Sequence, residues 1–329
     1  MSKKNTHHIY KLEQLRKPAQ TLTKEKLEKR AKAKYSQEPL LLALLELKES
    51  KLAKNYKDAF FCSSVLTQKG DKLTSRYCKN RFCRVCNRIS TGKLINNYAP
   101  ILDKLTDKQF VTLTIPNVAA ENLRSSIIKM NKVMRLIQDK RRKAKIPLIK
   151  GIRKLECTYN TFLNNYHPHF HLIIENEAQA TDLINEWLFY YPEAVIQAQH
   201  KAEATECIEL FKYFTKLTSN TGATYENGSK VKDEWQFPEA IDVIFTHIAK
   251  LRIVQSMGGI RLVDDKIKDL ETQIVDKETI KEYTGVYFWY GENWYDPYTG
   301  ELITNFCPTE NLNKYRKKIR YLQKEKQYE

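Results

Sequence analysis

The spacing of apolar residues changes along this chain from a helical repeat to the alternation that is typical of strands. In the basic N-terminal part, apolar residues recur every three or four positions over 22–35 and 39–56, which predicts helices. Alternating or continuous apolar runs then predict strands at 110–117, 152–160 and 165–174. The last two are separated only by a short turn, part of which "NNY" supplies, so we expect them to be neighbouring strands.

The rest of the pattern is mostly helical and ends in an aromatic-rich hairpin. Predicted helices cover residues 121–145, 180–190, 203–217 and 240–257. A Ser/Asn/Gly-rich stretch at 218–230 is expected to be a break, and 283–306 combines aromatic strands with Gly, Asp and Pro turns. Strands and helices do not alternate strictly. We therefore expect an α+β fold, with a central antiparallel sheet and helices packed on one face.

Composition divides the chain into four expected regions. Residues 1–60 are a basic helical N-terminal region, and 61–95 are a cysteine-rich segment. Residues 96–225 hold the central domain, and 226–329 form a C-terminal region that is helical and then a β-hairpin.

The overall charge narrows the class of partner. The chain has 56 Lys+Arg against 39 Asp+Glu, a formal net charge of +17, which favours a polyanion and nucleic acid ahead of an anionic membrane. Hydrophobic residues make up 42%, enough for a packed core. No apolar run is long enough for a membrane span, and the N-terminus lacks the apolar stretch of a signal peptide, so we expect a cytoplasmic protein.

Three histidines at every second position carry the first chemical signal. In "NYHPHFHLII", strand alternation directs His167, His169 and His171 to one face and the apolar residues to the other. Separate surface histidines are the alternative, but several imidazoles on one face indicate a metal site. Glu156 lies on the polar face of "IRKLECTYN", so a carboxylate can join two imidazoles if the two strands pair. Such a set suits Mn²⁺, Mg²⁺, Zn²⁺ or Fe²⁺.

A polar stripe on the predicted helix "ECIELFKYFTK" carries the second signal. Glu209, Tyr213 and Lys216 share one side of this helix, opposite its apolar face. Lys212 and Lys216 would favour the phenolate of Tyr213 and neutralise phosphate charge, while a glutamate can act as general base. A structural tyrosine is the alternative.

Four clustered cysteines and a basic run complete the candidate chemistry. Cys62, Cys78, Cys83 and Cys86 follow the pattern C-x15-C-x4-C-x2-C, which indicates a structural Zn²⁺ site, with buried thiols as the alternative. The run at 140–154 predicts phosphate contacts rather than a merely solvated helix face. Its candidate DNA-binding residues are Arg141, Arg142 and Lys143.

Taken in order, three of these segments resemble the motifs of rolling-circle plasmid replication initiators. The segments are "FVTLTIPN", "RKLECTYN" with "YHPHFHLII", and "ELFKYFTK", and "HFH" is similar to the His-hydrophobic-His motif of the HUH endonucleases. The resemblance covers roughly residues 60–220. A single tyrosine in the third motif resembles the one-tyrosine class, and the cysteine-rich stretch before the first motif is similar to that of such initiators.

The resemblance implies a set of site residues. It assigns a divalent metal, Mg²⁺ or Mn²⁺, to His169 and His171, with Glu156 completing the site. Tyr213 would form the covalent link to DNA, and Glu209 would activate water for termination. His167 is left as a second-layer residue or a DNA contact.

The implied activity is that of a DNA nicking-joining endonuclease whose HUH catalytic domain is 96–225. Cleavage of a single-stranded or hairpin site in a plasmid or phage origin would leave a 5′-phosphotyrosine and a 3′-OH primer for a host polymerase. The chain has no GxxxxGK[ST] loop, so a host helicase is expected as a partner.

Three alternatives remain open. A mobilisation relaxase or HUH transposase would share the metal and the tyrosine. A zinc-dependent DNA-binding regulator would lack catalysis. A non-haem iron oxygenase would also use two histidines and a carboxylate, but strong basicity and the Tyr213 segment argue against it.

Overall fold

The computed structural model forms two units, each built from segments that are distant in sequence. The first unit is 1–98 with 264–317, and the second is 99–263 with 318–329. The structure describes residues 21–70, 72–204, 210, 219–226, 229–260, 272–275 and 285–322. Within that part of the chain, no helix combines the length and the apolar character needed to cross a bilayer. The four-region division of the sequence stays a prediction.

A six-stranded sheet organises the first unit. Its order is β1-β11-β3-β2-β12-β13, from strands β1 (Thr21–Leu22), β2 (Val65–Lys69), β3 (Lys72–Ser75), β11 (Thr272–Val275), β12 (Gly285–Tyr290) and β13 (Asn293–Tyr295). The helices are α2 (Lys24–Leu45), α3 (Ala53–Phe60), α9 (Glu310–Arg316) and most of α4 (Arg84–Leu102). The predicted C-terminal hairpin is confirmed as β12 and β13, and it joins the sheet beside β2.

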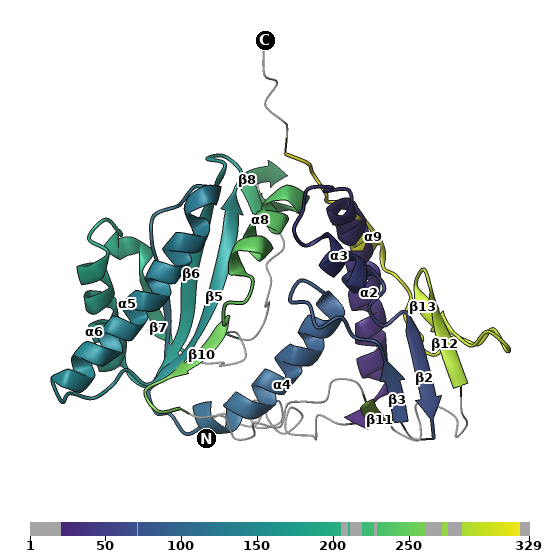
Figure 1. Cartoon of the computed structure of the whole chain (residues 1–329), viewed down its shortest axis with the longest axis horizontal. Coiled ribbons are helices and arrows are strands. Elements are labelled where there is room, and N and C mark those ends of the chain that lie inside the picture. The colour runs from purple at the N-terminus through teal and green to yellow at the C-terminus, as the bar shows by residue number, and fades with distance from the viewer. Residues whose placement is uncertain are drawn as a thin grey trace, which may run out of the picture. The chain divides into compact units, whose positions relative to one another are not determined.

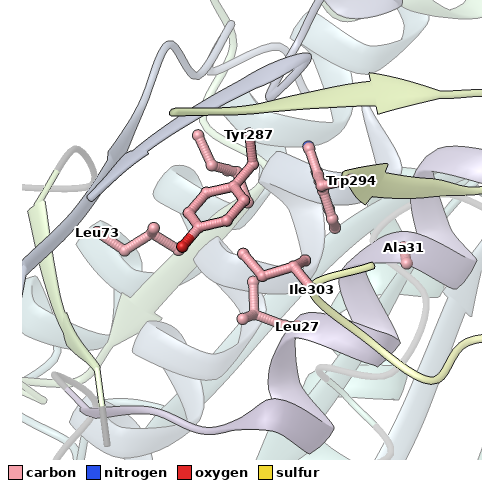
Figure 2. Close-up of a cluster of buried hydrophobic side chains, with 7 residues drawn as sticks. Leu27, Ala31, Leu73, Tyr287, Trp294 and Ile303 are labelled. Atoms are coloured by element: carbon pink, nitrogen blue, oxygen red, sulfur yellow. The ribbon is translucent and has the colours of Figure 1, made fainter. Parts of the chain in front are cut away.

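The first unit has an apolar core between α2 and the sheet (Figure 2). Leu27 and Ala31 of α2 contact a cluster that includes Leu73, Tyr287 and the fully buried Trp294. The indole Nε1 of Trp294 donates to the backbone oxygen of Ser63 at 2.7 Å, so this buried polar group is satisfied. N- and C-terminal segments therefore share one core.

A five-stranded antiparallel sheet organises the second unit (Figure 1). Its order is β10-β5-β6-β4-β7, from strands β4 (Gln109–Thr114), β5 (Gly151–Asn160), β6 (Asn165–Ile174), β7 (His200–Glu203) and β10 (Val254–Met257). The remaining elements are α5 (Leu123–Lys143), α6 (Glu177–Tyr190), α8 (Pro238–Ile248), β8 (Ser219–Glu226), β9 (Ser229–Trp235) and the short 3-10 helices η1 (Ala120–Asn122) and η2 (Ile196–Ala198).

Helices α5 and α6 pack on one face of this sheet, as the apolar side of its strands predicts (Figure 1). Phe170 of β6 meets Trp187 of α6 edge to face, with ring centroids 6.0 Å apart. Leu172 and Ile174 of the same strand are fully buried. The expected α+β class with an antiparallel sheet is confirmed, and Lys154, Glu156 and the three histidines of β6 lie on the opposite face.

Pro168 lies inside β6, at a point where it breaks no hydrogen bond of the ladder. The last pair between β4 and β6 is Thr114 with His169, and Tyr166 exchanges both backbone hydrogen bonds with Val118, each 2.8 Å long. Since alternate residues of a strand direct their backbone groups to the same neighbour, the nitrogen of Pro168 points into the interval between these pairs. A proline fits there because no acceptor needs its missing N–H.

Two predictions of secondary structure were wrong. The stretch 218–230 is not a break but contains β8 and the start of β9, an antiparallel pair separated by Asn-Gly, a strong hairpin signal. The helix predicted over 240–257 ends early, because Lys250 takes a left-handed φ of 63° and residues 254–257 pair with β5 as β10. The helix α4 was not predicted.

The helix expected over 203–217 does not begin where it was placed. Glu203 is the last residue of β7 and pairs with Gln109 of β4. Residues 205–209 and 211–218 lie outside the described part of the chain.

The turn after β10 gives a test of the fold. Gly258 has a φ of +64°, and a Cβ there would lie 2.6 Å from the backbone oxygen of Ile149 and from the Cα of Lys150. Gly258→Ala should lower the free energy of unfolding by about 2–4 kcal/mol, through left-handed strain and the clash together. Gly259→Ala is the matched control, since its φ is +87° but a Cβ there would have no atom within 4 Å. It should lower the free energy of unfolding by only about 1 kcal/mol. Equal losses in urea unfolding would contradict this packing.

Candidate metal centres

The sheet face of the second unit that lies opposite α5 and α6 carries a row of imidazoles on β6. The rings of His167 and His169 stack with centroids 5.0 Å apart, and those of His169 and His171 meet edge to face at 4.8 Å. The predicted common face of the three histidines is therefore present.

The pairing of β5 with β6 adds a carboxylate to this row. Glu156 lies directly opposite His169 in the register. Its Oε2 is 3.8 Å from Nε2 of His169 and 3.6 Å from Nε2 of His171. The ligand atoms of the three residues all lie within 4.8 Å of one another. The structure brings together the three side chains that the sequence grouped.

His169 and His171 are each oriented by a hydrogen bond from Nδ1, the ring nitrogen that does not face Glu156. The backbone oxygen of His167 lies 3.0 Å from Nδ1 of His169, and because a carbonyl only accepts, Nδ1 of His169 is the protonated nitrogen. Thr112 Oγ1 lies 3.0 Å from Nδ1 of His171 and can accept in the same way. Each ring then directs the lone pair of Nε2 toward Glu156, which is the arrangement of metal-bound histidines.

Glu156 is held by a buried cation on its own strand. Lys154 Nζ lies 2.6 Å from Oε1, and the lysine side chain is 0% exposed. Burial alone would raise the pKa of Glu156, but the charge of Lys154, followed by that of His171, outweighs it, so the pKa lies below its usual value. Glu156 is therefore ionised near neutral pH, as a candidate ligand must be.

His167, at the end of the row, is a neutral side chain. Burial, and then the neighbouring His169, lowers the pKa of His167 to about 4. Its backbone oxygen orients His169 as described, but its imidazole offers no positive charge to a phosphate.

This donor set fits one divalent ion. Oε2 of Glu156 lies 3.6 Å and 3.8 Å from the two Nε2 atoms. Metal–ligand bonds are about 2.0–2.2 Å long, so ligand atoms that share one ion lie at separations of this size. Glu156, His169 and His171 could hold the ion and leave further positions for oxygen ligands.

A second candidate centre lies in the first unit and consists of four cysteines. The sulfur atoms of Cys62, Cys78, Cys83 and Cys86 all lie within 4.8 Å of one another. Sγ of Cys86 is 3.4 Å from that of Cys62 and 3.7 Å from that of Cys78. A tetrahedral Zn²⁺ with Zn–S bonds of about 2.3 Å requires sulfurs about 3.8 Å apart, so this cluster fits zinc.

Backbone amides donate hydrogen bonds to the sulfur cluster. The amide of Lys79 donates to Sγ of Cys86 at 3.3 Å, and Lys79 has a left-handed φ of 58°. Hydrogen bonding among the four thiols, followed by burial, raises the pKa of Cys62, while the same thiol contacts lower the pKa of Cys83. A bound cation would compensate several thiolates at once. The cluster could therefore hold a metal between β3 and the start of α4.

The other predicted site residues fall into two groups. Tyr213, Glu209, Lys216 and Lys212 lie outside the described residues. Arg141 is only 5% exposed and donates to Glu186 at 2.6 Å, to Asp182 at 3.1 Å and to the backbone oxygen of Pro147 at 2.7 Å. Its guanidinium links α5 to α6 and is buried. The predicted DNA contact of Arg141 was therefore wrong. Arg142 and Lys143 are exposed at the end of α5.

Sequence reasoning missed two residues of the candidate centre in the second unit. Thr112 lies opposite His171 in the register between β4 and β6, and Lys154 lies opposite His171 on the other side. Strand alternation places Lys154 on the Glu156 face, a signal visible in the sequence. Thr112 could be found only after the register between β4 and β6 was known.

The orienting role of Thr112 can be tested by removing its hydroxyl. Thr112→Val keeps the shape but leaves Nδ1 of His171 without this partner, so Mn²⁺ affinity should fall about tenfold. Isothermal titration calorimetry measures this directly. Thr158→Val, two positions beyond Glu156 on β5, is the matched control and should change affinity less than about twofold. Equal effects would exclude an orienting role for Thr112.

The sulfur cluster predicts a structural metal. Cys83→Ser should lower bound zinc from roughly one equivalent to a small fraction and reduce the thermal stability of the protein, because the metal replaces a local apolar core. Cys307→Ser serves as control, since Cys307 is exposed and outside the cluster. Full zinc content in the Cys83 variant, by elemental analysis, would rule out the site.

A family of known proteins matches a segment that contains most residues of the two candidate centres. The family described as "Replication protein" matches residues 71–179, a segment that contains Glu156, both candidate histidine ligands and three of the clustered cysteines. No solved structure matches the chain.

Curated relatives carry the same description. "Protein rep" of Staphylococcus aureus is 32% identical over 135 residues, which is 37% of this chain and 58% of that protein. "Protein rep" of Streptococcus pneumoniae is 32% identical over 105 residues, 30% of this chain and 32% of that protein. "Protein rep" of a Bacillus species is 31% identical over 135 residues, 37% of this chain and 43% of that protein. The chain thus spans about half the length, or less, of these relatives. The match and the relatives confirm the predicted resemblance to rolling-circle plasmid replication initiators, and residues 71–179 are the segment that is similar to the replication-protein family.

Proposed function

We propose that this protein initiates rolling-circle DNA replication by nicking and rejoining one strand of an origin. The observation that carries the proposal is the convergence of Glu156, His169 and His171 on one sheet face, inside the segment that matches replication proteins. The orientation of both imidazoles through Nδ1 supports a metal-dependent reaction there.

Each centre is assigned a metal by its donor atoms. Two imidazoles and a carboxylate with open positions would hold Mg²⁺ or Mn²⁺, which when bound would draw charge from a phosphodiester oxygen and make phosphorus a better electrophile. The four-cysteine cluster would hold a structural Zn²⁺.

The proposed nucleophile is Tyr213, from the motif that resembles the one-tyrosine initiators. Its phenolic oxygen forms a bond to phosphorus while the bond from phosphorus to the 3′ oxygen breaks. The products are a 5′-phosphotyrosine and, once the leaving oxygen takes a proton, a free 3′-OH. Lys216 favours the phenolate, and Glu209 activates water for the final hydrolysis. The covalent link retains the energy of the broken bond, so rejoining needs no nucleotide.

Basic residues are proposed to hold the DNA strand. The formal net charge of +17 supports binding to the phosphate backbone of a plasmid or phage origin. Lys212 and the exposed ends of Arg142 and Lys143 are the candidate contacts. A host helicase would unwind the duplex and a host polymerase would extend the 3′-OH.

The nucleophile can be identified directly. Wild-type protein incubated with Mn²⁺ and candidate origin hairpins should form a covalent adduct whose tryptic peptide, by mass spectrometry, carries an oligonucleotide on Tyr213. Tyr213→Phe should lose the adduct and slow nicking by at least about 10³-fold, because no hydroxyl remains to attack phosphorus. DNA affinity should stay within about twofold of wild type.

Tyr298→Phe is the control, since Tyr298 is 94% exposed in the first unit and should nick at the wild-type rate. Normal nicking by Tyr213→Phe would refute the assignment of the nucleophile. DNA binding that needs neither Mg²⁺ nor Mn²⁺ but is lost with the zinc of the cysteine cluster, without any nicking, would favour a zinc-dependent regulator. An adduct that forms only at a transfer origin would favour a mobilisation relaxase.

A further inference from the structure

A buried lysine borders the candidate metal centre of the second unit. Lys154 is on β5, two residues before Glu156, so both side chains project from the same sheet face. The Lys154 side chain is 0% exposed, and its Nζ lies 2.6 Å from Oε1 of Glu156. Burial of an ammonium group is costly, and an ion pair with good geometry is what makes it tolerable.

Because of this ion pair, the two carboxylate oxygens of Glu156 have different partners. Oε1 accepts from Lys154, whereas Oε2 lies 3.6 Å and 3.8 Å from the Nε2 atoms of the two histidines. Glu156 is therefore held with one oxygen toward the imidazoles. Lys154 acts on the centre through this carboxylate and is a positioning residue.

The same pair cancels the charge that a metal ion needs. Glu156 contributes one negative charge, Lys154 contributes one positive charge, and histidines that bind a metal are neutral, so the group has no net charge. Glu156 and Lys154 together would then offset none of the charge of a divalent ion, which would lie in a partly buried site beside a cation. Such like-charge proximity is strongly unfavourable where the effective dielectric constant is low.

We propose that Lys154 makes divalent metal binding depend on the substrate: the centre binds its ion weakly until a phosphodiester supplies the missing negative charge. This inference rests on the proposed function, because the phosphate is that of the bound strand. By thermodynamic linkage, the ion must strengthen binding of the strand by the same factor by which the strand strengthens binding of the ion.

The charge of Lys154 can be removed while its volume is largely kept. At pH 8, Lys154→Met should bind Mn²⁺ about tenfold more tightly than wild type in the absence of DNA, measured by calorimetry or by electron paramagnetic resonance of unbound Mn²⁺. Lys154→Arg keeps the charge and should remain as weak as wild type. Lys150→Met is the matched control, since Lys150 pairs with Glu175 at 2.6 Å, away from the centre, and should change affinity less than about twofold.

The coupling itself is measured with a pool of single-stranded oligonucleotides at saturating concentration. Wild type should bind Mn²⁺ about tenfold more tightly with the pool than without it. The Mn²⁺ affinity of Lys154→Met should increase less than about threefold when the pool is added. Circular dichroism and thermal unfolding check that the variant is folded. If Lys154→Met does not fold, Lys154→Gln gives the same comparison, and the wild-type coupling is tested without any variant.

Three results would overturn the inference. The first is a wild-type affinity for Mn²⁺ that does not change when DNA is added. The second is an unchanged or lower Mn²⁺ affinity of the uncharged variants. The third is a higher Mn²⁺ affinity of Lys154→Arg. None of these measurements requires strand cleavage. Coupled binding of Mn²⁺ and DNA without nicking would count against the proposed function and leave the inference standing. Nicking without coupled binding would support the proposed function and count against the inference.

Discussion

The antiparallel register between β5 and β6 is the constraint on which the candidate centre depends. It places Glu156 opposite His169 and Lys154 opposite His171, while the alternation of side chains keeps all four on one face. A shift of one residue would turn Glu156 toward the helices and move an apolar residue to the face of the histidines. The buried face of β6, with Phe170 packed against α6, opposes such a shift. The core of the sheet therefore fixes the chemistry on its other side.

Around this register, neighbouring strands determine how the ligands are presented. Thr112 of β4 and the backbone of β6 fix the imidazoles through Nδ1, and Lys154 fixes the carboxylate through Oε1. The three donors are thus set toward one point before any ion binds, which lowers the cost of ordering them. The sulfur cluster of the first unit is a separate candidate centre, in which four thiols lie within 4.8 Å of one another.

Sequence alone predicted the parts that follow from local periodicity. The faces of His169 and Glu156 follow from strand alternation, and the cysteine cluster follows from its spacing. Contacts between distant segments could not be predicted in this way. The pairing of β12 with β2, the return of β10 to β5, and the contact of Thr112 with His171 each depend on tertiary register. The hairpin of β8 and β9 was missed although its Asn-Gly signal was present, because its polar strands lack the alternation of apolar residues that marks a strand.

Pulsed electron paramagnetic resonance of bound Mn²⁺ tests the central claim most directly, because it detects nitrogen nuclei bonded to the ion. With Mn²⁺ and a single-stranded oligonucleotide, the wild-type spectrum should contain couplings to two imidazole nitrogens, and His171→Ala should retain only one. A saturated sample whose Mn²⁺ has only water and phosphate around it, with no nitrogen coupling, would contradict the account.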